Sequence, residues 1–174
     1  MKLIDAILKR RSVRTYKNED ISKENLRKIL QAGLLAPTSR NLKPCEFIVV
    51  RDKETLTKLS KSKKSGAGML ADCNTAIVVV ADSNKADTWI EDSAIALSYM
   101  DLMAVILGIW SCWVQIYLRS AEDGTAAEEN VREIFGLSEN NRIVGILSLG
   151  IPMTEPKGHT IDEADFAKVH GFEW

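Results

Sequence analysis

The sequence predicts an α+β or α/β domain in which helices cover a β-sheet. Segments with apolar residues at helical spacing alternate along the chain with short runs that are apolar throughout. The chain has 174 residues, which matches the usual size of one domain, so we assign residues 1–174 to a single domain. Its content of 45 % hydrophobic and 27 % charged residues is that of an ordinary soluble globular protein.

The first third of the chain has two amphipathic helices and a strand. Leucines and isoleucines at helical spacing predict a short helix over residues 2–10. A second helix follows Ser22, which is a favoured N-cap residue. It ends before Pro37, because proline disfavours the helical conformation in the preceding residue. After a polar loop, residues 47–50 form a predicted buried strand.

The middle of the chain contains the predicted centre of the fold. Residues 53–64 indicate a basic helix that Gly66 breaks. Residues 75–81 are apolar on both faces, which is typical of a central strand. Residues 88–107 form a long helix that is apolar almost all round, so we expect it to be buried in the domain or in a dimer. Residues 110–117 are a strand or an extended loop.

The last third has one further helix and one further strand. Residues 125–128 have the spacing of a capping box, and the helix that they open ends at Gly136. Residues 144–149 form a third predicted strand. Residues 151–174 lack strong periodicity and end in Trp174, whose large apolar surface is expected to pack on another part of the protein.

The cysteines and the apolar runs indicate a cytoplasmic location. Cys45, Cys73 and Cys112 are odd in number and widely spaced, which favours a reducing compartment over a disulfide framework. The N-terminus lacks the pattern of a secretory signal. The longest apolar runs are far shorter than the ~20 residues that span a bilayer, so we expect no membrane insertion.

Charge is distributed unevenly along the chain. Residues 1–64 hold 17 Lys and Arg against 7 Asp and Glu, whereas residues 65–174 hold 6 against 17. This asymmetry indicates either a polyanionic ligand or pairing between the two halves. The basic residues are dispersed through helical patterns without a recognition motif, so the sequence does not favour nucleic acid as a partner.

The chemistry-bearing residues favour a bound cofactor over a side-chain nucleophile or a metal. The chain has no GxSxG or HExxH motif, no paired Cys/His spacing and no GxGxxG after a strand. Three arginines and a serine within residues 10–14 suit a phosphate dianion, although basic residues also complement a helix C-terminus. The polar loop at residues 38–41 is either a ligand contact or a simple turn.

Four stretches in the right order, spanning nearly the whole chain, resemble the nitroreductase family of FMN-dependent oxidoreductases. They are residues 10–16 (RRSVRTY), residues 36–50 (APTSRNLKPCEFIVV), the helix from residue 92 that leads into LGIWSCW at residues 107–113, and a closing segment with Gly150-Ile151-Pro152, Lys157, Val169-His170 and Trp174. Each stretch alone is weak, and the ordered set is strong.

The resemblance implies an α+β fold with a mixed β-sheet flanked by helices, formed as an intertwined homodimer with two FMN molecules at the interface. It assigns FMN contacts to one clamp, one loop, one backbone segment and one tail segment. The clamp is Arg10, Arg11 and Ser12 at the phosphate and ribityl chain, with Arg14 at the flavin ring. The loop is Pro37, Thr38, Ser39 and Asn41, which would contact the flavin bound mainly by the other subunit. The backbone segment is Gln115 and Ile116, facing flavin N5, and the tail segment is Lys157 and His159, at the phosphate.

The implied activity is ping-pong hydride transfer. NADH or NADPH serves as a transient electron donor, and a nitroaromatic, a quinone or a similar electron-poor small molecule is the acceptor, with no obligatory side-chain nucleophile. The alternative is a flavin carrier with little turnover, because Trp110 and Ile116 are bulkier than the family pattern. The chain also has Lys43 and Cys45 in the loop where the family has Gln and Trp, and His159 where it has Arg.

Overall fold

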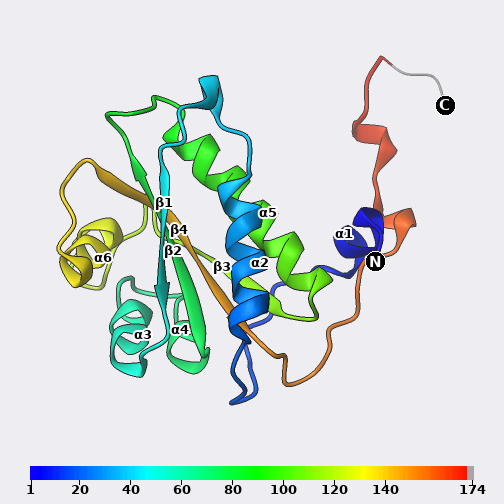
Figure 1. The fold of residues 1–174 in the computed structure, drawn as a ribbon, viewed down its shortest axis with the longest axis horizontal. Helices are drawn as coiled ribbons and strands as arrows, with labels where there is room; N and C mark the ends of the chain where they lie inside the picture. Colours follow the sequence, from blue (N-terminus) through cyan, green and yellow to red (C-terminus); the bar gives the residue numbers. More distant parts are fainter. Residues whose placement is uncertain (172–174) are drawn as a thin grey trace.

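The computed structural model describes residues 1–171 of the chain. The helices are α1 (Leu3–Lys9), α2 (Lys23–Leu34), α3 (Lys53–Ser60), α4 (Met69–Asp72), α5 (Trp89–Ile106) and α6 (Ala127–Phe135), with the 3-10 helices η1 (Ser39–Asn41), η2 (Ile161–Glu163) and η3 (Phe166–Lys168) (Figure 1). The strands are β1 (Cys45–Val50), β2 (Thr75–Asp82), β3 (Trp110–Gln115) and β4 (Asn141–Gly150).

The four strands form one sheet in the order β1-β2-β4-β3. The three pairings between these strands are antiparallel. The parallel component of the expected mixed sheet is the isolated bridge between Ser12 and Ser111 at the β3 edge. The α+β class is confirmed, and so is the central position of β2, which is flanked by β1 and β4 and buried along nearly its whole length.

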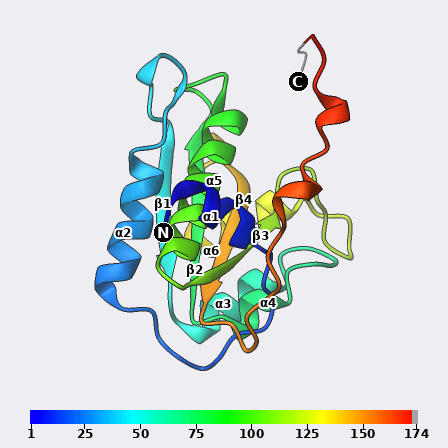
Figure 2. The same ribbon diagram turned by 90° about the vertical axis from the view of Figure 1, so that its right-hand side faces the viewer.

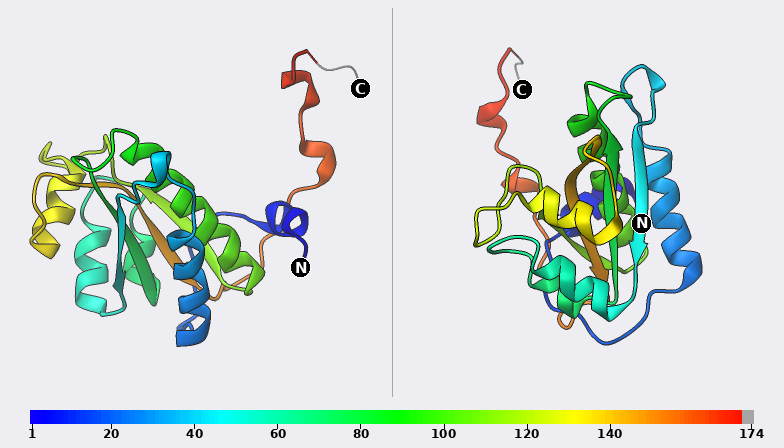
Figure 3. Two further views of the ribbon diagram at one scale, coloured as in Figure 1. Left: turned by 45° about the horizontal axis from the view of Figure 1, so that its top comes forward. Right: turned by 90° about the vertical axis from the view of Figure 1, so that its left-hand side faces the viewer.

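Helices cover both faces of the sheet (Figures 1 and 3). Side chains alternate between the faces of a strand, so Ile77 and Val79 pack with α2 and α5, whereas Val78 and Val80 pack with α3, α4 and α6. The two faces of β2 therefore belong to two separate apolar clusters. This arrangement explains why the strand is apolar throughout its sequence.

The long buried helix predicted over residues 88–107 is α5. It lies beside α2, and Gly33 of α2 allows the close approach, since a Cβ there would lie 2.9 Å from Met100 Cγ. The helix ends before Gly108, whose φ of +72° is the left-handed conformation that favours glycine. Leu97 and Met100 are fully buried, whereas Tyr99 remains exposed on the opposite side.

Two local predictions are wrong. The capping box at residues 125–128 does not form, because the Glu128 carboxylate accepts hydrogen bonds from the Arg142 side chain and the Ile143 N–H instead. A tertiary partner thus replaces the local cap. The basic helix predicted over residues 53–64 is the shorter α3, and α4 follows the Gly66 turn without having been predicted.

The two ends of the described chain leave the body on the same side (Figures 1 and 2). Gly158 approaches α1 so closely that a Cβ would lie 2.8 Å from Leu8 O. Beyond this contact, residues 160–171 are all exposed. The predicted packing of Trp174 lies outside the described residues. No helix among residues 1–171 is both long and apolar enough to cross a membrane.

Candidate functional site

The N-terminal basic segment is extended chain that meets β3 at Ser111 and then pairs with the chain after β4. Helix α1 ends at Lys9, and Arg10 has an extended ψ of 127°. Val13 then donates its N–H to Ser111 O at 2.9 Å, and Ser12 pairs with Ser111 in the parallel bridge. Val13 is buried, whereas its neighbours Ser12 and Arg14 are exposed. The segment therefore anchors one side in the core and presents hydroxyl and guanidinium groups on the other.

A partly buried carboxylate on α5, that of Asp101, contacts this segment and β3. Arg10 Nη1 is 3.6 Å from Asp101 Oδ2, and Ser111 donates its Oγ hydrogen to Asp101 Oδ1. The side chain of Asp101 is 17 % exposed, against 35 % for Arg10. Burial raises the pKa of Asp101, and the Ser111 hydrogen bond and the Arg10 charge act in the opposite direction.

A further cation reaches the far end of β3. Lys63 Nζ donates to Gln115 O at 2.9 Å. Burial lowers the pKa of Lys63, and the charge of Arg119 acts in the same direction. Burial also raises the pKa of the Cys112 thiol, and the charges of Arg14 and Lys63 oppose that shift, so both cations lie near this part of β3. The sequence did not single out Lys63, since it lies in a lysine-rich run without a distinguishing pattern.

The backbone after β3 is held within the fold. Ile116 donates its N–H to Val144 O at 3.0 Å and its side chain is fully buried. The side chain of Gln115 accepts from Trp113 Nε1 and donates to Tyr117 O. In the segment that the resemblance places against the flavin, the Ile116 N–H is therefore hydrogen-bonded to β4, and the Gln115 side chain is hydrogen-bonded to neighbouring residues.

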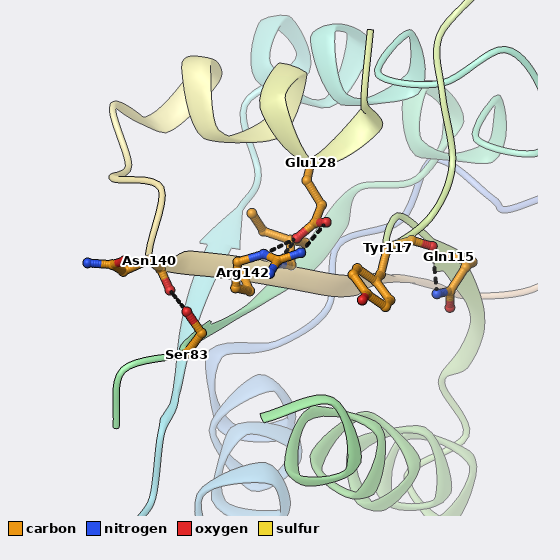
Figure 4. A network of polar contacts seen from close by, with 7 residues as sticks. Ser83, Gln115, Tyr117, Glu128, Asn140 and Arg142 are labelled. Atoms are coloured by element: carbon orange, nitrogen blue, oxygen red, sulfur yellow. Dashed lines mark hydrogen bonds and ion pairs between the residues drawn. The ribbon is translucent and has the colours of Figure 1, made fainter. Parts of the chain in front are cut away.

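An arginine-centred network fixes the same segment from the other side (Figure 4). Arg142 donates two hydrogen bonds of 3.0 Å to Glu128. Its guanidinium carbon lies 4.5 Å from the ring centroid of Trp89 and 5.3 Å from that of Tyr117. The two rings pack edge to face with centroids 5.0 Å apart. The network links β4, α5 and α6 to the chain after β3, where Leu118 has a left-handed φ of +56°.

The tail reaches the basic segment through His159. Its N–H donates to Leu8 O at 2.6 Å, and its Nδ1 atom lies 3.5 Å from Arg11 Nη1 and 2.6 Å from Glu163 Oε2. The hydrogen bond with His159 lowers the pKa of Glu163. Lys157 is exposed beside this contact in the sequence. The structure therefore brings Arg11 and His159 together across 148 positions of sequence.

The predicted loop lies elsewhere, at the start of α5. Ser39 donates its N–H to Asp92 Oδ1 at 2.9 Å, and Thr38 Oγ1 accepts from the Lys43 N–H. Asn41 has a left-handed φ of +55°, and it is exposed together with Pro37. The loop is thus a rigid polar turn, attached to the opposite end of α5 from Arg10. One chain does not bring the loop and the basic segment together.

Known proteins resemble this chain along its whole length. A family model described as the nitroreductase family matches residues 7–67 and 61–151. A relative from Archaeoglobus fulgidus, assigned by name as an NADH dehydrogenase/NAD(P)H nitroreductase, is 38 % identical over 173 residues, which cover 97 % of this chain and 96 % of the relative. A relative of the same name from Methanothermobacter thermautotrophicus is 31 % identical over 177 residues. The match covers 100 % of this chain and 88 % of the relative.

Solved structures show the same fold. An FMN-dependent nitroreductase from Clostridium difficile superimposes with a TM-score of 0.94 at 42 % identity, over 98 % of this chain and 99 % of that one. The matched family model includes the basic segment, the loop and all four strands. The chain therefore belongs to the nitroreductase family.

Proposed function

We propose that this protein is an FMN-dependent oxidoreductase that uses NADH or NADPH to reduce nitroaromatics, quinones or similar electron-poor acceptors. The observation that carries the proposal is a group of cations beside β3, with Arg10 on Asp101, Arg11 on His159 and Lys63 on Gln115 O. The names of the relatives, NAD(P)H nitroreductase and FMN-dependent nitroreductase, support the same assignment.

The donor set fits the phosphate of FMN. Arg10 and Arg11 are partly exposed, so guanidinium N–H groups remain available to a ligand, and the hydroxyl of Ser12 is exposed next to them. Guanidinium groups bind phosphate oxygens bidentately and keep their charge. His159 is held against Arg11, so the tail can add a contact to the same phosphate.

Two further cations, Arg14 and Lys63, suit the ring of the flavin. When bound, FMN supplies two-electron transfer between NAD(P)H and the acceptor. Reduced flavin tends to carry negative charge at N1/O2, and the positive charges of Arg14 and Lys63, both near Cys112, would favour that charge electrostatically. The chain's own contribution is to bind and orient the cofactor. Cys112 is buried with a raised pKa, which is typical of a structural thiol and not of a nucleophile.

A homodimer completes the site in this proposal. The loop with Thr38 and Ser39 and the segment with Arg10 are held on opposite sides of α5, so a second copy is needed to place both against one cofactor. Apolar residues on α1, such as Leu3 and Ile4, are exposed, and the tail leaves the body beside this helix (Figure 3). A partner protomer would cover these surfaces.

The carrier alternative has no structural support in the described chain. Trp110 and Ile116, whose bulk suggested a narrowed cofactor space, both lie in the apolar cluster on the α3, α4 and α6 side of the sheet. Their volume is accommodated by the core.

Anaerobic mixing tests the proposed function. The purified protein should be yellow, and heat should release FMN from it. NADH or NADPH should bleach the bound flavin, and an added quinone should restore the colour. Protein that binds FMN but shows no bleaching with either nucleotide would be a carrier, and protein without affinity for FMN would overturn the proposal entirely.

A further inference from the structure

The carboxylate of Asp101 contacts Arg10 directly and contacts Val13 indirectly, through Ser111. It lies within 3.6 Å of Arg10, and it accepts a hydrogen bond from Ser111, the residue whose carbonyl holds Val13. One carboxylate on α5 therefore fixes both the first arginine of the segment and the β3 position that sets the register of the chain after it.

We propose that Asp101 is a positioning residue that orients Arg10 for the phosphate of the cofactor; this rests on the proposed function. Arg10 has a long side chain and is 35 % exposed, so without a partner it would sample many rotamers. Asp101 is the acid within ion-pair distance of Arg10 in the described chain, and it lies at the Nη1 atom while the arginine side chain stays partly exposed.

The location of Asp101 argues for this role over a simple contribution to stability. A carboxylate with 17 % exposure among the mostly apolar residues of this part of α5 loses much of its hydration. Its pKa is raised despite Arg10 and Ser111, which means that the ionised form is less favourable here than in the unfolded chain. Burial thus disfavours this charge, whereas the ion pair with Arg10 and the hydrogen bond from Ser111 give the carboxylate its positioning role.

The direction in which Asp101→Asn changes the affinity for FMN separates a positioning role from an effect of net charge. Asp101→Asn keeps the shape and can still accept from Ser111, but it loses the charge that holds Arg10. Added net positive charge alone would make FMN bind more tightly. Loss of positioning makes FMN bind more weakly, and riboflavin, which lacks the phosphate, should be little affected.

The experiment is a fluorescence titration of apoprotein with FMN and with riboflavin, accompanied by thermal unfolding of the apoprotein. For Asp101→Asn we expect the Kd for FMN to rise about three- to tenfold. The ratio of the FMN and riboflavin constants should change by nearly as much. The unfolding temperature of the apo variant should be no lower than that of the parent.

Two further variants make the test specific. In an Arg10→Ala background, Asp101→Asn should change the Kd for FMN hardly at all, because the residue through which it acts is gone. Asp20→Asn is the matched control, since it removes the carboxylate from another Asp–Arg pair, 3.4 Å from Arg51 and outside the site. It should leave both flavin constants unchanged.

The outcomes separate this inference from the proposed function. A parent protein that binds no FMN overturns the proposed function, and the inference with it. If the parent binds FMN and the Asp101→Asn variant binds it as tightly or more tightly, the inference alone is overturned. Equal weakening of FMN and riboflavin, together with a lower unfolding temperature, would show that Asp101 only supports the fold.

Discussion

Asp92 and Asp101 point to opposite sides of α5 and hold two different segments of the chain. They are nine residues apart, which is about two and a half turns and about 14 Å along the helix. Asp92 accepts from the Ser39 N–H, and Asp101 pairs with Arg10. The two carboxylates thus explain why residues that the family resemblance assigns to one cofactor lie apart in a single chain.

The first prediction follows from this separation and concerns assembly. The protein should sediment as a homodimer, with an interface burying well over ~2,000 Å², as obligate dimers do. Ile4→Glu places a charge on the exposed apolar side of α1 and should shift the protein towards monomer with loss of FMN. Lys2→Glu changes the charge at the N-cap of the same helix without removing apolar surface and is the control. A folded monomeric parent with full FMN occupancy would contradict the dimer.

The second prediction concerns the phosphate. Arg10→Ala should weaken binding of FMN about ten- to hundredfold, because a charge-assisted hydrogen bond contributes about 1.5–3 kcal/mol. Riboflavin should lose much less. Arg27→Ala, on the exposed side of α2, is the control and should leave both constants unchanged. Equal losses for the two flavins would mean that Arg10 supports the fold only.

The third prediction concerns pH. Because burial raises the pKa of Asp101 in the folded chain, ionisation of this group lowers stability as pH rises from the ordinary aspartate pKa through the raised value. Arg10, Tyr16 and Cys112 are the other titratable groups that interact with it. The free energy of unfolding of the apo parent, minus that of Asp101→Asn, should therefore increase on acidification through this window. Denaturant titrations at several pH values measure it, and a difference that falls on acidification would show that the ionised carboxylate stabilises the fold.

Local patterns predicted the main elements because packing agreed with them. Residues 75–81 are apolar on both faces and form the buried β2, and Gly136 ends α6 with a left-handed φ of +64°. The helix predicted over residues 2–10 is also present, and it ends at Lys9. In these segments the local preference and the tertiary environment favour the same conformation.

The remaining features depend on partners that are distant in sequence. Glu128 pairs with Arg142, fourteen positions away, and does not form the predicted capping box at the start of α6. Lys63 and Asp101 look like ordinary surface and helix residues until the fold brings them to β3. Sequence spacing alone could not place them, because their partners come from elements that meet only in the folded sheet.

The fourth prediction concerns the reduction potential. Beyond Arg11 the chain is extended and rises about 3.3 Å per residue, so Arg14 lies roughly 10 Å from Arg11 along the segment. That displacement is sufficient to move from the phosphate end towards the ring end of FMN. A cation there stabilises the negatively charged reduced flavin more than the neutral oxidised form. Arg14→Gln should therefore lower the potential of bound FMN by an amount near 30 mV, which corresponds to about 1.4 kcal/mol for two electrons.

Lysine substitutions separate the ring end from the phosphate end. Arg14→Lys should keep most of the potential, since a point charge suffices beside the ring, and Lys63 already contributes a second cation near Cys112. Arg10→Lys should still weaken FMN, because the bidentate fork is lost. Redox titrations of bound FMN in each variant make the comparison. An unchanged potential in Arg14→Gln, with the flavin still bound, would show that Arg14 is not at the ring and that the direction of the whole segment along the cofactor is reversed or displaced.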